Sequence, residues 1–272
     1  MIPNPRLSLV MVLIITLLLT GCGGGNLPSV EDLPVDISDI PGIPEPLRQL
    51  PEIWQELGLP DLDDIPNLPQ LENLPLIESS QNRLVLRGPM ERRFEVGEPI
   101  PGTDIQLVAI GDEGAEFQIA GLRSLRAVGD SLDFDGQWPG LPGATYNLRL
   151  RIYQISANHI RSAGVHQIAI EGIQPQSNNA QPAESNLSFP YTANAEIGQL
   201  FPGTTYGYQG QDDRGALISG LPEGDYPYRK VGDSIKWTGQ LRPEVPAQFN
   251  LRMLFYNESQ TQVGGIVRLS LP

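Results

Sequence analysis

Residues 147–152 read Asn147-Leu148-Arg149-Leu150-Arg151-Ile152, with an apolar residue at every second position. Successive side chains of a β-strand point to opposite faces, so this alternation predicts a strand that is buried on one face. Other runs rich in β-branched and apolar residues also read as strands: residues 84–86, 105–110 and 165–170. No comparable helical period follows Ser79, so we expect an all-β fold.

The chain after Ser79 contains an internal duplication. Val128-Gly129-Asp130-Ser131 recurs as Val231-Gly232-Asp233-Ser234, and Asn147-Leu148-Arg149 matches Asn250-Leu251-Arg252. The offset between the copies stays near 101 residues with small drifts, and it is 103 at these two matches. A period this long exceeds the roughly 20–50 residues of a solenoid unit, so each copy should be a whole domain.

We therefore expect two tandem immunoglobulin-like antiparallel β-sandwiches, because short strands with turn signals between them fill both copies. Repeat 1 covers residues 79–173 and repeat 2 covers residues 185–272. Residues 174–184 are Pro, Gln, Ser, Asn and Ala with a final Glu184 and no apolar period, and they predict a hinge between the repeats.

The N-terminus has the features of an export signal. A single base, Arg6, precedes an apolar run from Leu9 to Leu19 that only Thr16 interrupts. A membrane-spanning helix needs about 20 apolar residues, and this run is shorter. We expect residues 1–21 to be a signal peptide rather than a permanent transmembrane helix.

Leu19-Thr20-Gly21-Cys22 follows the apolar run. This tetrapeptide resembles the lipobox of bacterial lipoproteins, and the resemblance implies that the Cys22 thiol is acylated and anchors the protein outside the cytoplasm. Some double-membraned bacteria keep lipoproteins in the inner membrane with Asp after the cysteine, so Gly23 favours the outer membrane where one exists. An ordinary secretory signal is the alternative. Cys22 is the only cysteine, so no intramolecular disulfide can form.

Residues 22–78 are expected to form an extended, largely disordered linker. Between Asn26 and Glu78 the chain has twelve acids and one base, and Leu or Ile precedes Pro nine times. Proline fixes φ and biases its predecessor toward extended geometry, so helix and sheet cannot persist there. The formal net charge is −14, and most of it lies in this linker. The repeats are nearly neutral, which argues against nucleic acid as a partner.

Residues 50–59 depart from the linker pattern. Pro51 and Glu52 suit a first helical turn, and Gly58 suits its end, so one or two turns of helix are expected. Trp54 would then anchor a docking motif in a partner's groove. The alternative is a transient kink, because so short a helix is marginal alone.

Repeat 2 is rich in aromatic residues, which alternate in pairs before a tryptophan: Tyr206, Tyr208, Tyr226, Tyr228 and Trp237. Aromatic faces can stack on sugars or form the centre of a protein interface, so Tyr208 and Trp237 are candidates for binding polysaccharide. Tyr208 also aligns with the apolar Leu107, which favours a place in the core.

Arg149 and Arg151 share the polar face of one predicted strand, and Arg252 repeats the first of them. The guanidinium group offers a planar fork of donors, so this row could bind an acidic polymer or a partner's carboxylates. A solvated face that blocks aggregation is the alternative.

Catalytic and metal-binding patterns are weak. The two histidines, His159 and His166, both lie in repeat 1, and no Gly-x-Ser-x-Gly turn accompanies them. Asp130, Asp133 and Asp135 could supply oxygen ligands, but the remaining spacing of a calcium loop is missing. We expect no enzymatic activity, no metal and no cofactor.

These observations predict a lipid-anchored protein of the cell envelope. The repeats would act as a non-enzymatic binding or scaffolding module for an envelope protein, and the linker would hold them off the membrane. A module that binds envelope polysaccharide is the alternative.

Overall fold

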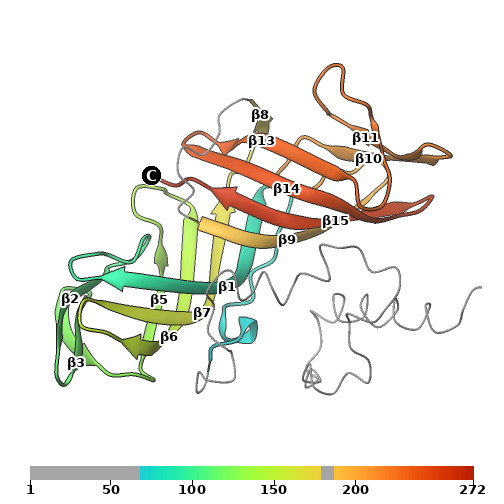
Figure 1. The fold of residues 1–272 in the computed structure, drawn as a ribbon. Coiled ribbons are helices and arrows are strands. Elements are labelled where there is room, and N and C mark those ends of the chain that lie inside the picture. Colours follow the sequence, from blue (N-terminus) through green and yellow to red (C-terminus); the bar gives the residue numbers. More distant parts are fainter. Residues whose placement is uncertain (1–67, 179–186) are drawn as a thin grey trace, which may run out of the picture. The chain divides into compact units, whose positions relative to one another are not determined.

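The computed structural model describes residues 68–178 and 187–272, which contain both repeats (Figure 1). Repeat 1 has two antiparallel sheets, a larger one in the order β1-β7-β6-β5 and a smaller one in the order β2-β3-β4. The strands are β1 (Arg83–Glu95), β2 (Ile105–Gly111), β3 (Gly114–Ile119), β4 (Leu122–Arg126), β5 (Ser131–Gln137), β6 (Ala144–Ile155) and β7 (His159–Glu171).

Repeat 2 has the same plan with one strand added at an edge. Its larger sheet has the order β8-β13-β14-β15-β9 and its smaller sheet the order β10-β11-β12. The strands are β8 (Gln176–Ser177), β9 (Leu187–Glu196), β10 (Gly207–Asp212), β11 (Gly215–Ser219), β12 (Tyr228–Arg229), β13 (Ser234–Arg242), β14 (Val245–Tyr256) and β15 (Gln260–Leu269). The predicted all-β class is confirmed. The last strand of each repeat pairs with an early long strand of the same repeat, β7 with β1 and β15 with β9.

Backbone hydrogen bonds show that equivalent residues of the two copies form the same turn. The Gly129 amide donates to the Ile152 carbonyl at 2.7 Å, and the Gly232 amide donates to the Met253 carbonyl at 2.8 Å. Glycine reaches the left-handed conformation of both turns without strain, with φ of 93° at Gly129 and 91° at Gly232. The recurring Gly-Asp-Ser segments therefore place the start of β5 and of β13.

The register within each sheet corrects one sequence match. Ser131 pairs with Arg151, and the equivalent Ser234 pairs with Arg252, so Arg252 is the counterpart of Arg151. The prediction that Arg252 repeats Arg149 is wrong by two residues. The reason is that the turn before β14 is two residues shorter than the turn before β6, as the flanking pairs show: Gln137 with Thr145, and Gln240 with Pro246.

The inner face of β6 has the alternation that the sequence predicted. Leu148, Leu150 and Ile152 are fully buried and belong to the core cluster, whereas Arg149 and Arg151 are only half-buried on the outer face. Asn147 also lies on the outer face, yet it is buried. This departure shows that the outer face of the sheet is covered near Asn147.

The end of the predicted linker contributes to that cover. Pro69 and Leu74 are buried, and the Gln167 side-chain amide of β7 donates to the Pro75 carbonyl at 3.1 Å. The short 3-10 turn η4 (Leu71–Asn73) lies between them. The predicted linker thus touches repeat 1 at the Pro75 carbonyl, while most side chains of residues 68–78 are exposed, among them Leu76 at 82%.

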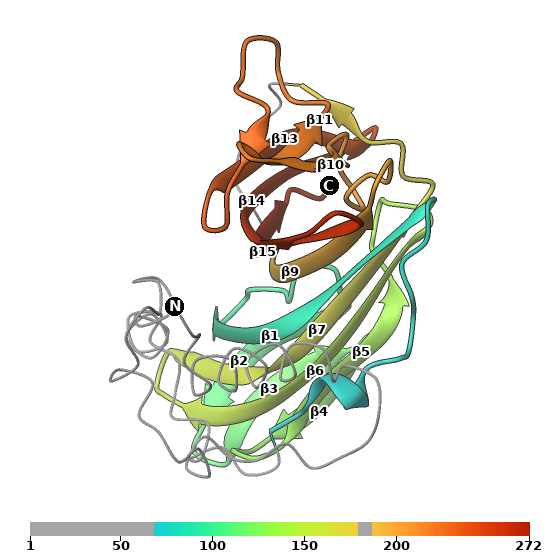
Figure 2. The same cartoon turned by 90° about the vertical axis from the view of Figure 1, so that its right-hand side faces the viewer.

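The two repeats share one hydrophobic core cluster and meet where β1 approaches β9 (Figure 2). Gly88 of β1 lies against Pro190 of β9, so close that a Cβ on Gly88 would lie 2.4 Å from the Pro190 Cδ atom. The rings of His166 and Phe189 stack across the same contact, with centroids 4.2 Å apart and planes 17° apart.

Polar contacts also join the repeats. The Arg242 guanidinium donates to the carbonyl oxygens of Glu171 and Pro142, each at 2.9 Å. The Trp138 indole donates to the Pro272 carbonyl at 3.0 Å. Part of the predicted hinge is itself fixed to repeat 2, because β8 pairs with β13. The rest of that hinge, residues 179–184, lies outside the described residues.

Across residues 68–178 and 187–272, no helix has the length and apolar character needed to span a membrane. The expected signal peptide, Cys22 and Trp54 lie outside the described residues.

Candidate functional site

The clearest difference between the two repeats is an insertion between β11 and β13. Six residue steps separate Leu122 from Val128 in repeat 1, whereas ten separate the equivalent Leu221 from Val231 in repeat 2. The four extra residues form a loop that turns at Gly224, whose φ is 90°. This loop carries Tyr226 and leads into β12, so the insertion adds aromatic residues that repeat 1 does not have.

Tyr226 on this loop is exposed and forms an aromatic pair with the half-buried Tyr228 of β12. Tyr226 keeps 61% of its surface exposed, although a ring of this size is normally at least partly buried. The two ring centroids lie 5.6 Å apart, and their planes are tilted by 49°. The pair therefore offers an open aromatic corner to a ligand.

Arg214 holds one side of this corner in place. Its guanidinium carbon lies 3.9 Å from the centroid of the Tyr228 ring, within the range of a cation–π contact. Its Nη2 atom contacts the Tyr228 hydroxyl and lies 2.6 Å from the Asp212 Oδ2 atom. The hydrogen bonds from Arg214 hold the pKa of Asp212 at about 2, well below its usual range. The pair stays ionised at neutral pH, and Tyr228 is fixed on one face.

Arg229 fixes the backbone that carries both tyrosines. It donates to the Tyr228 carbonyl at 3.0 Å, to the Ser234 carbonyl at 3.2 Å and to the Tyr226 carbonyl. Among the described residues, neither Arg229 nor Lys230 forms an ion pair. Their positive charges are thus available to a bound anionic group.

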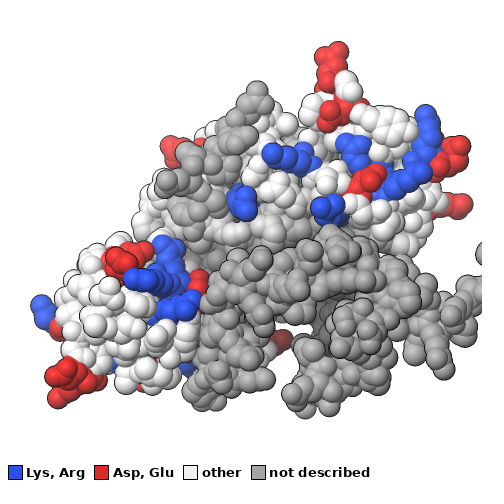
Figure 3. All heavy atoms as spheres, viewed as in Figure 1, with Lys and Arg blue, Asp and Glu red and all other residues white. Residues whose placement is uncertain are grey.

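Together these residues line an open hollow of about 620 Å³. Figure 3 shows basic and acidic side chains gathered side by side at the end of repeat 2 that carries β10 and β11. The hollow is large enough for a short stretch of peptide or a sugar unit. Its lining consists of Asp213, Arg214, Tyr226, Tyr228, Arg229, Lys230, Asp233 and Ser234.

The sequence analysis named Tyr226 and Tyr228 as an alternating pair but missed Arg214 and Arg229. Arg214 belongs to the turn between β10 and β11, and only folding brings it over Tyr228. The signal that could have found the site is the length difference between the repeats. Repeat 1 folds without the extra residues, so an insertion confined to repeat 2 is not needed for the fold and can serve another role.

Tyr208 and Trp237 are not part of any surface. Both are fully buried in the core of repeat 2, and the Trp237 indole donates to the Thr205 hydroxyl at 3.0 Å. The Tyr208 hydroxyl donates to the Asn257 carbonyl. The interpretation of Tyr208 and Trp237 as a sugar-stacking surface is therefore wrong, because their ring faces are covered by core side chains. The alignment of Tyr208 with Leu107 indicated this position.

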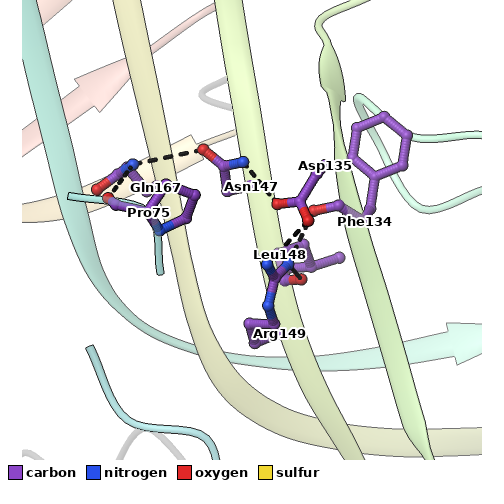
Figure 4. A network of polar contacts seen from close by, with 7 residues as sticks. All are labelled: Pro75, Phe134, Asp135, Asn147, Leu148, Arg149 and Gln167. Carbon is purple, nitrogen blue, oxygen red and sulfur yellow. Dashed lines mark hydrogen bonds and ion pairs between the residues drawn. The ribbon is translucent and has the colours of Figure 1, made fainter. Parts of the chain in front are cut away.

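Arg149 is also committed to contacts within the protein (Figure 4). Its Nη2 atom donates to the Asp135 Oδ2 atom at 2.9 Å, and its Nη1 atom donates to the carbonyl oxygens of Phe134 and Leu148. The Asn147 amide donates to the other Asp135 oxygen at 2.7 Å. Although partial burial alone would raise it, the pKa of Asp135 is lowered by these hydrogen bonds.

The predicted row of two arginines is therefore not equally available. Arg149 keeps only 18% of its side chain exposed, and its Nη atoms already bond Asp135 and two carbonyl oxygens, so the structure gives it little surface to offer a ligand. Arg151 lies two residues farther along the same face and is half-buried. No ion pair of Arg151 is formed within the described part of the chain.

The histidines do not assemble a catalytic group among the described residues. His166 is buried and lies 3.2 Å from the Tyr146 hydroxyl, and burial lowers the pKa of His166 to about 3. The His159 ring lies 2.9 Å from the Asn158 side-chain oxygen, at the far end of β7. No cluster of three His, Cys, Asp or Glu side chains able to hold a metal occurs in residues 68–178 or 187–272.

Comparison of the whole chain with protein-family models, with curated proteins and with solved structures finds no match in any of the three. The hollow at Tyr226 thus has to be interpreted from its own geometry and chemistry.

Proposed function

We propose that this protein is a lipid-anchored component of the bacterial cell envelope whose β-repeats form a non-enzymatic binding or scaffolding module. The observation that carries the proposal is the exposed Tyr226 on the insertion of repeat 2, paired with the half-buried Tyr228 of β12 and backed by Arg214 and Arg229. Tyrosine and arginine are the residue types that dominate the centres of protein interfaces. Such a pair outside the core of repeat 2 is available to contact another protein.

The anchor belongs to the same proposal. The lipobox-like Leu19-Thr20-Gly21-Cys22 supplies the lipid, and the acidic, proline-rich segment that follows supplies reach. Like charges on that segment and on an anionic membrane surface repel each other, which favours projection of the repeats away from the lipid. The ligand is then an envelope protein met at some distance from the anchoring membrane.

The experiment that tests this proposal is crosslinking of the intact lipoprotein in its own envelope, followed by mass spectrometry of what is captured. Reproducible capture of one envelope protein, lost with Tyr226→Ala, supports the proposal. A Trp54→Ala variant and a variant without the linker separate docking by the linker from docking by the repeats. Equal capture by all variants would contradict the assignment of the hollow as the binding site for the captured protein. Recovery of a Cys22→Ser variant in the membrane fraction would contradict the lipid anchor.

Binding of envelope polysaccharide is a second candidate, favoured by the same exposed ring. A free tyrosine face beside unpaired bases can stack on a sugar and hold its acidic substituent. Retardation of the full-length protein in gels that contain envelope glycan, abolished by Tyr226→Ala, would establish this candidate. Unchanged migration would exclude it.

A further inference from the structure

We propose that the side of repeat 1 formed by β4 and β5 binds a second copy of this chain, so that β4 of each copy pairs with β5 of the other about a two-fold axis. The surface belongs to repeat 1, whereas the hollow at Tyr226 belongs to repeat 2, so the inference goes beyond the proposed function. Three features carry it: the open edges of the two strands, the exposed leucines of β4 and the charges along both edges.

β4 and β5 are the open edges of the two sheets of repeat 1. Each is the last strand of its sheet, and the turn 127–130 joins them, so both edges lie on the same side of the sandwich. Among residues 68–178 and 187–272, no strand lies beside the five residues of β4 or the seven residues of β5 on that side. An open edge presents unpaired amides and carbonyls, and it is a template for pairing with another chain.

Repeat 2 covers the edge that corresponds to β5 with a strand of its own. β8 pairs with the end of β13, and the Asn178 amide donates to the Thr238 carbonyl at 3.2 Å. In the register that aligns Ser131 with Ser234, the counterpart of Thr238 is Asp135. The Asp135 carbonyl therefore points out of the edge of β5, where no backbone amide of the described chain donates to it. This edge of repeat 1 can accept a strand as β13 does.

β4 also carries two exposed leucines. Leu122 keeps 74% of its surface exposed, and Leu125 keeps 54%. The counterpart of Leu122 in repeat 2 is Leu221, which packs against the core cluster. Removal of apolar surface from water favours association. A strand that pairs along β4 would cover apolar surface that repeat 2 covers by itself.

The two leucines lie on different faces of β4. Leu122 pairs with Ile119, which packs against the core, so Leu122 is on the inner face of the small sheet. Leu125 pairs with Glu116 and lies on the outer face. When β4 of one copy pairs with β5 of the other, the two sheets become continuous. Leu125 then adjoins the outer face of β5, and Leu122 is covered by the second sandwich.

The charges select pairing between unlike edges. Arg123 of β4 keeps 72% of its side chain exposed, in a solvated ion pair with Glu116 of a kind that contributes little to stability. Asp133 of β5 is exposed and forms no ion pair within the described part of the chain. Arg123 of one copy can therefore lie opposite Asp133 of the other. Pairing of β4 with β4, or of β5 with β5, would bring like charges together, which destabilises a sheet.

The two other acids beside Asp133 are engaged within the chain. Asp130 accepts a hydrogen bond from the Ala127 amide at 2.8 Å. Asp135 accepts from the Arg149 guanidinium at 2.9 Å and from the Asn147 amide at 2.7 Å. Asp133 is thus the acid that β5 offers to a second chain.

These features favour a second copy over a different partner. A two-fold interface needs a surface that is complementary to itself. The β4–β5 side of repeat 1 has one open edge in each sheet, a free base on one edge and a free acid on the other. Two copies related by a two-fold axis form the same contact twice and leave neither edge open. The assembly therefore closes as a dimer.

The test places a photo-crosslinking phenylalanine derivative at position 125 of the full-length protein and maps the adducts by mass spectrometry. Equal amounts of isotopically light and heavy protein are mixed in phosphatidylcholine vesicles. We expect adducts to residues 131–137, formed between labels as often as within them. The control carries the derivative at position 197 of repeat 2, since Ile197 is 51% exposed, and it should give at least several-fold fewer. Adducts only within one label, or equal yields from both positions, would overturn the inference.

Exchange of the two charges separates the two-fold pairing from other contacts. Arg123→Glu and Asp133→Lys should each lower the yield between labels several-fold. Repeat 2 has Lys236 at the place of Asp133, so the fold accepts a lysine there. Mixed in equal amounts, the two variants should restore the yield, because each meets an opposite charge at both contacts.

An unchanged yield of either single variant would overturn the inference, and so would a mixture of the two that gives no more adducts than each variant alone. Adducts from position 125 to another protein only, in the native envelope, would also overturn it. None of these results affects the proposed function, because its site lies in repeat 2.

Discussion

The ring of His166 stacks on the ring of Phe189, with centroids 4.2 Å apart, and this contact joins the cores of the two repeats. Residues 88 and 166 pair across β1 and β7, and residues 189 and 267 pair at the equivalent place in repeat 2. Gly88 of repeat 1 and Phe189 of repeat 2 therefore occupy equivalent positions of their sheets. Repeat 2 has an aromatic ring at this position, whereas repeat 1 has no side chain there. The duplicated sheets therefore differ in sequence at the point where they meet.

Substitution of Gly88 by alanine should destabilise the protein. The new Cβ would lie 2.4 Å from the Pro190 Cδ atom, so β1 and β9 would have to separate. Overpacking of this kind lowers the free energy of unfolding by about 1–3 kcal/mol. Urea denaturation of the full-length protein measures it. Gly111→Ala is the matched control, since nothing lies within 4 Å of its Cβ, and we expect a change within about 0.5 kcal/mol. Equal effects of the two substitutions would contradict the close approach.

The free energy of unfolding should fall as the pH is lowered, in part through His166. Burial lowers the pKa of His166 to about 3 from an ordinary value of 6.5. Above pH 6.5 the ring is neutral in both states, and the stability linked to it is fully present. Between pH 6.5 and about 3 only the unfolded chain takes up the proton, so stability is lost at up to about 1.4 kcal/mol per pH unit.

Denaturation curves across this window measure the slope for the native protein and for His166→Phe, which keeps an aromatic ring and cannot titrate. We expect a shallower slope for the variant. A slope unaffected by His166→Phe would refute the role of this ring.

Trp237→Ala should unfold repeat 2 rather than probe a ligand site. The indole is fully buried and packs edge-to-face on Phe249, with ring centroids 5.4 Å apart. Loss of such a side chain costs about 3–5 kcal/mol. Tyr226→Ala removes a ring that is 61% exposed, and we expect a change within about 0.5 kcal/mol. Thermal melts of the two variants distinguish these cases, and a Trp237→Ala protein as stable as the native one would show that the core assignment is wrong.

Removal of the Asn147 amide should loosen residues 68–78. Asn147 connects Gln167, which holds the Pro75 carbonyl, to the Asp135 carboxylate. Asn147→Ala removes one hydrogen bond from the buried Gln167 amide and one from the Asp135 carboxylate, while Gln167 keeps the Pro75 carbonyl and Asp135 keeps Arg149, so we expect a cost of about 0.5–1.5 kcal/mol. Hydrogen exchange in residues 68–78 should become faster. Thr145→Ala, two residues away on the same face of β6, is the control and should leave that exchange unchanged.

The strands were predictable because their signal is local. The alternation at residues 147–152 and the repeated Gly-Asp-Ser turns place β6, β5 and β13 correctly. The same period explains the mistaken match of Arg252 with Arg149. A shift of two residues leaves every side chain on its own face, so the pattern cannot reveal it. Only the pairing of Ser234 with Arg252 does so.

The candidate site residues were less predictable because exposure depends on packing between distant segments. Tyr208 and Tyr226 have the same chemistry, yet one is fully buried and the other is 61% exposed. The contacts of Arg149 with Asp135 and of Arg214 with Tyr228 join different strands or turns. The Leu-Pro pairs at residues 68–75 read as linker because their composition is that of the preceding segment. Their burial depends on a sheet face whose shape the sequence does not state.

The contact between the repeats has a mechanical consequence. The chain enters the described body at Leu68 on repeat 1, while the hollow at Tyr226 lies on repeat 2. A partner that pulls on the hollow against a lipid anchor would load the junction in between. Besides the connecting chain, two sets of contacts join the repeats at this junction. One is the stacking of His166 on Phe189, and the other is the pair of hydrogen bonds from Arg242 to the Glu171 and Pro142 carbonyls. Tension would be shared among these contacts, and the pair of repeats would resist stretching as one body.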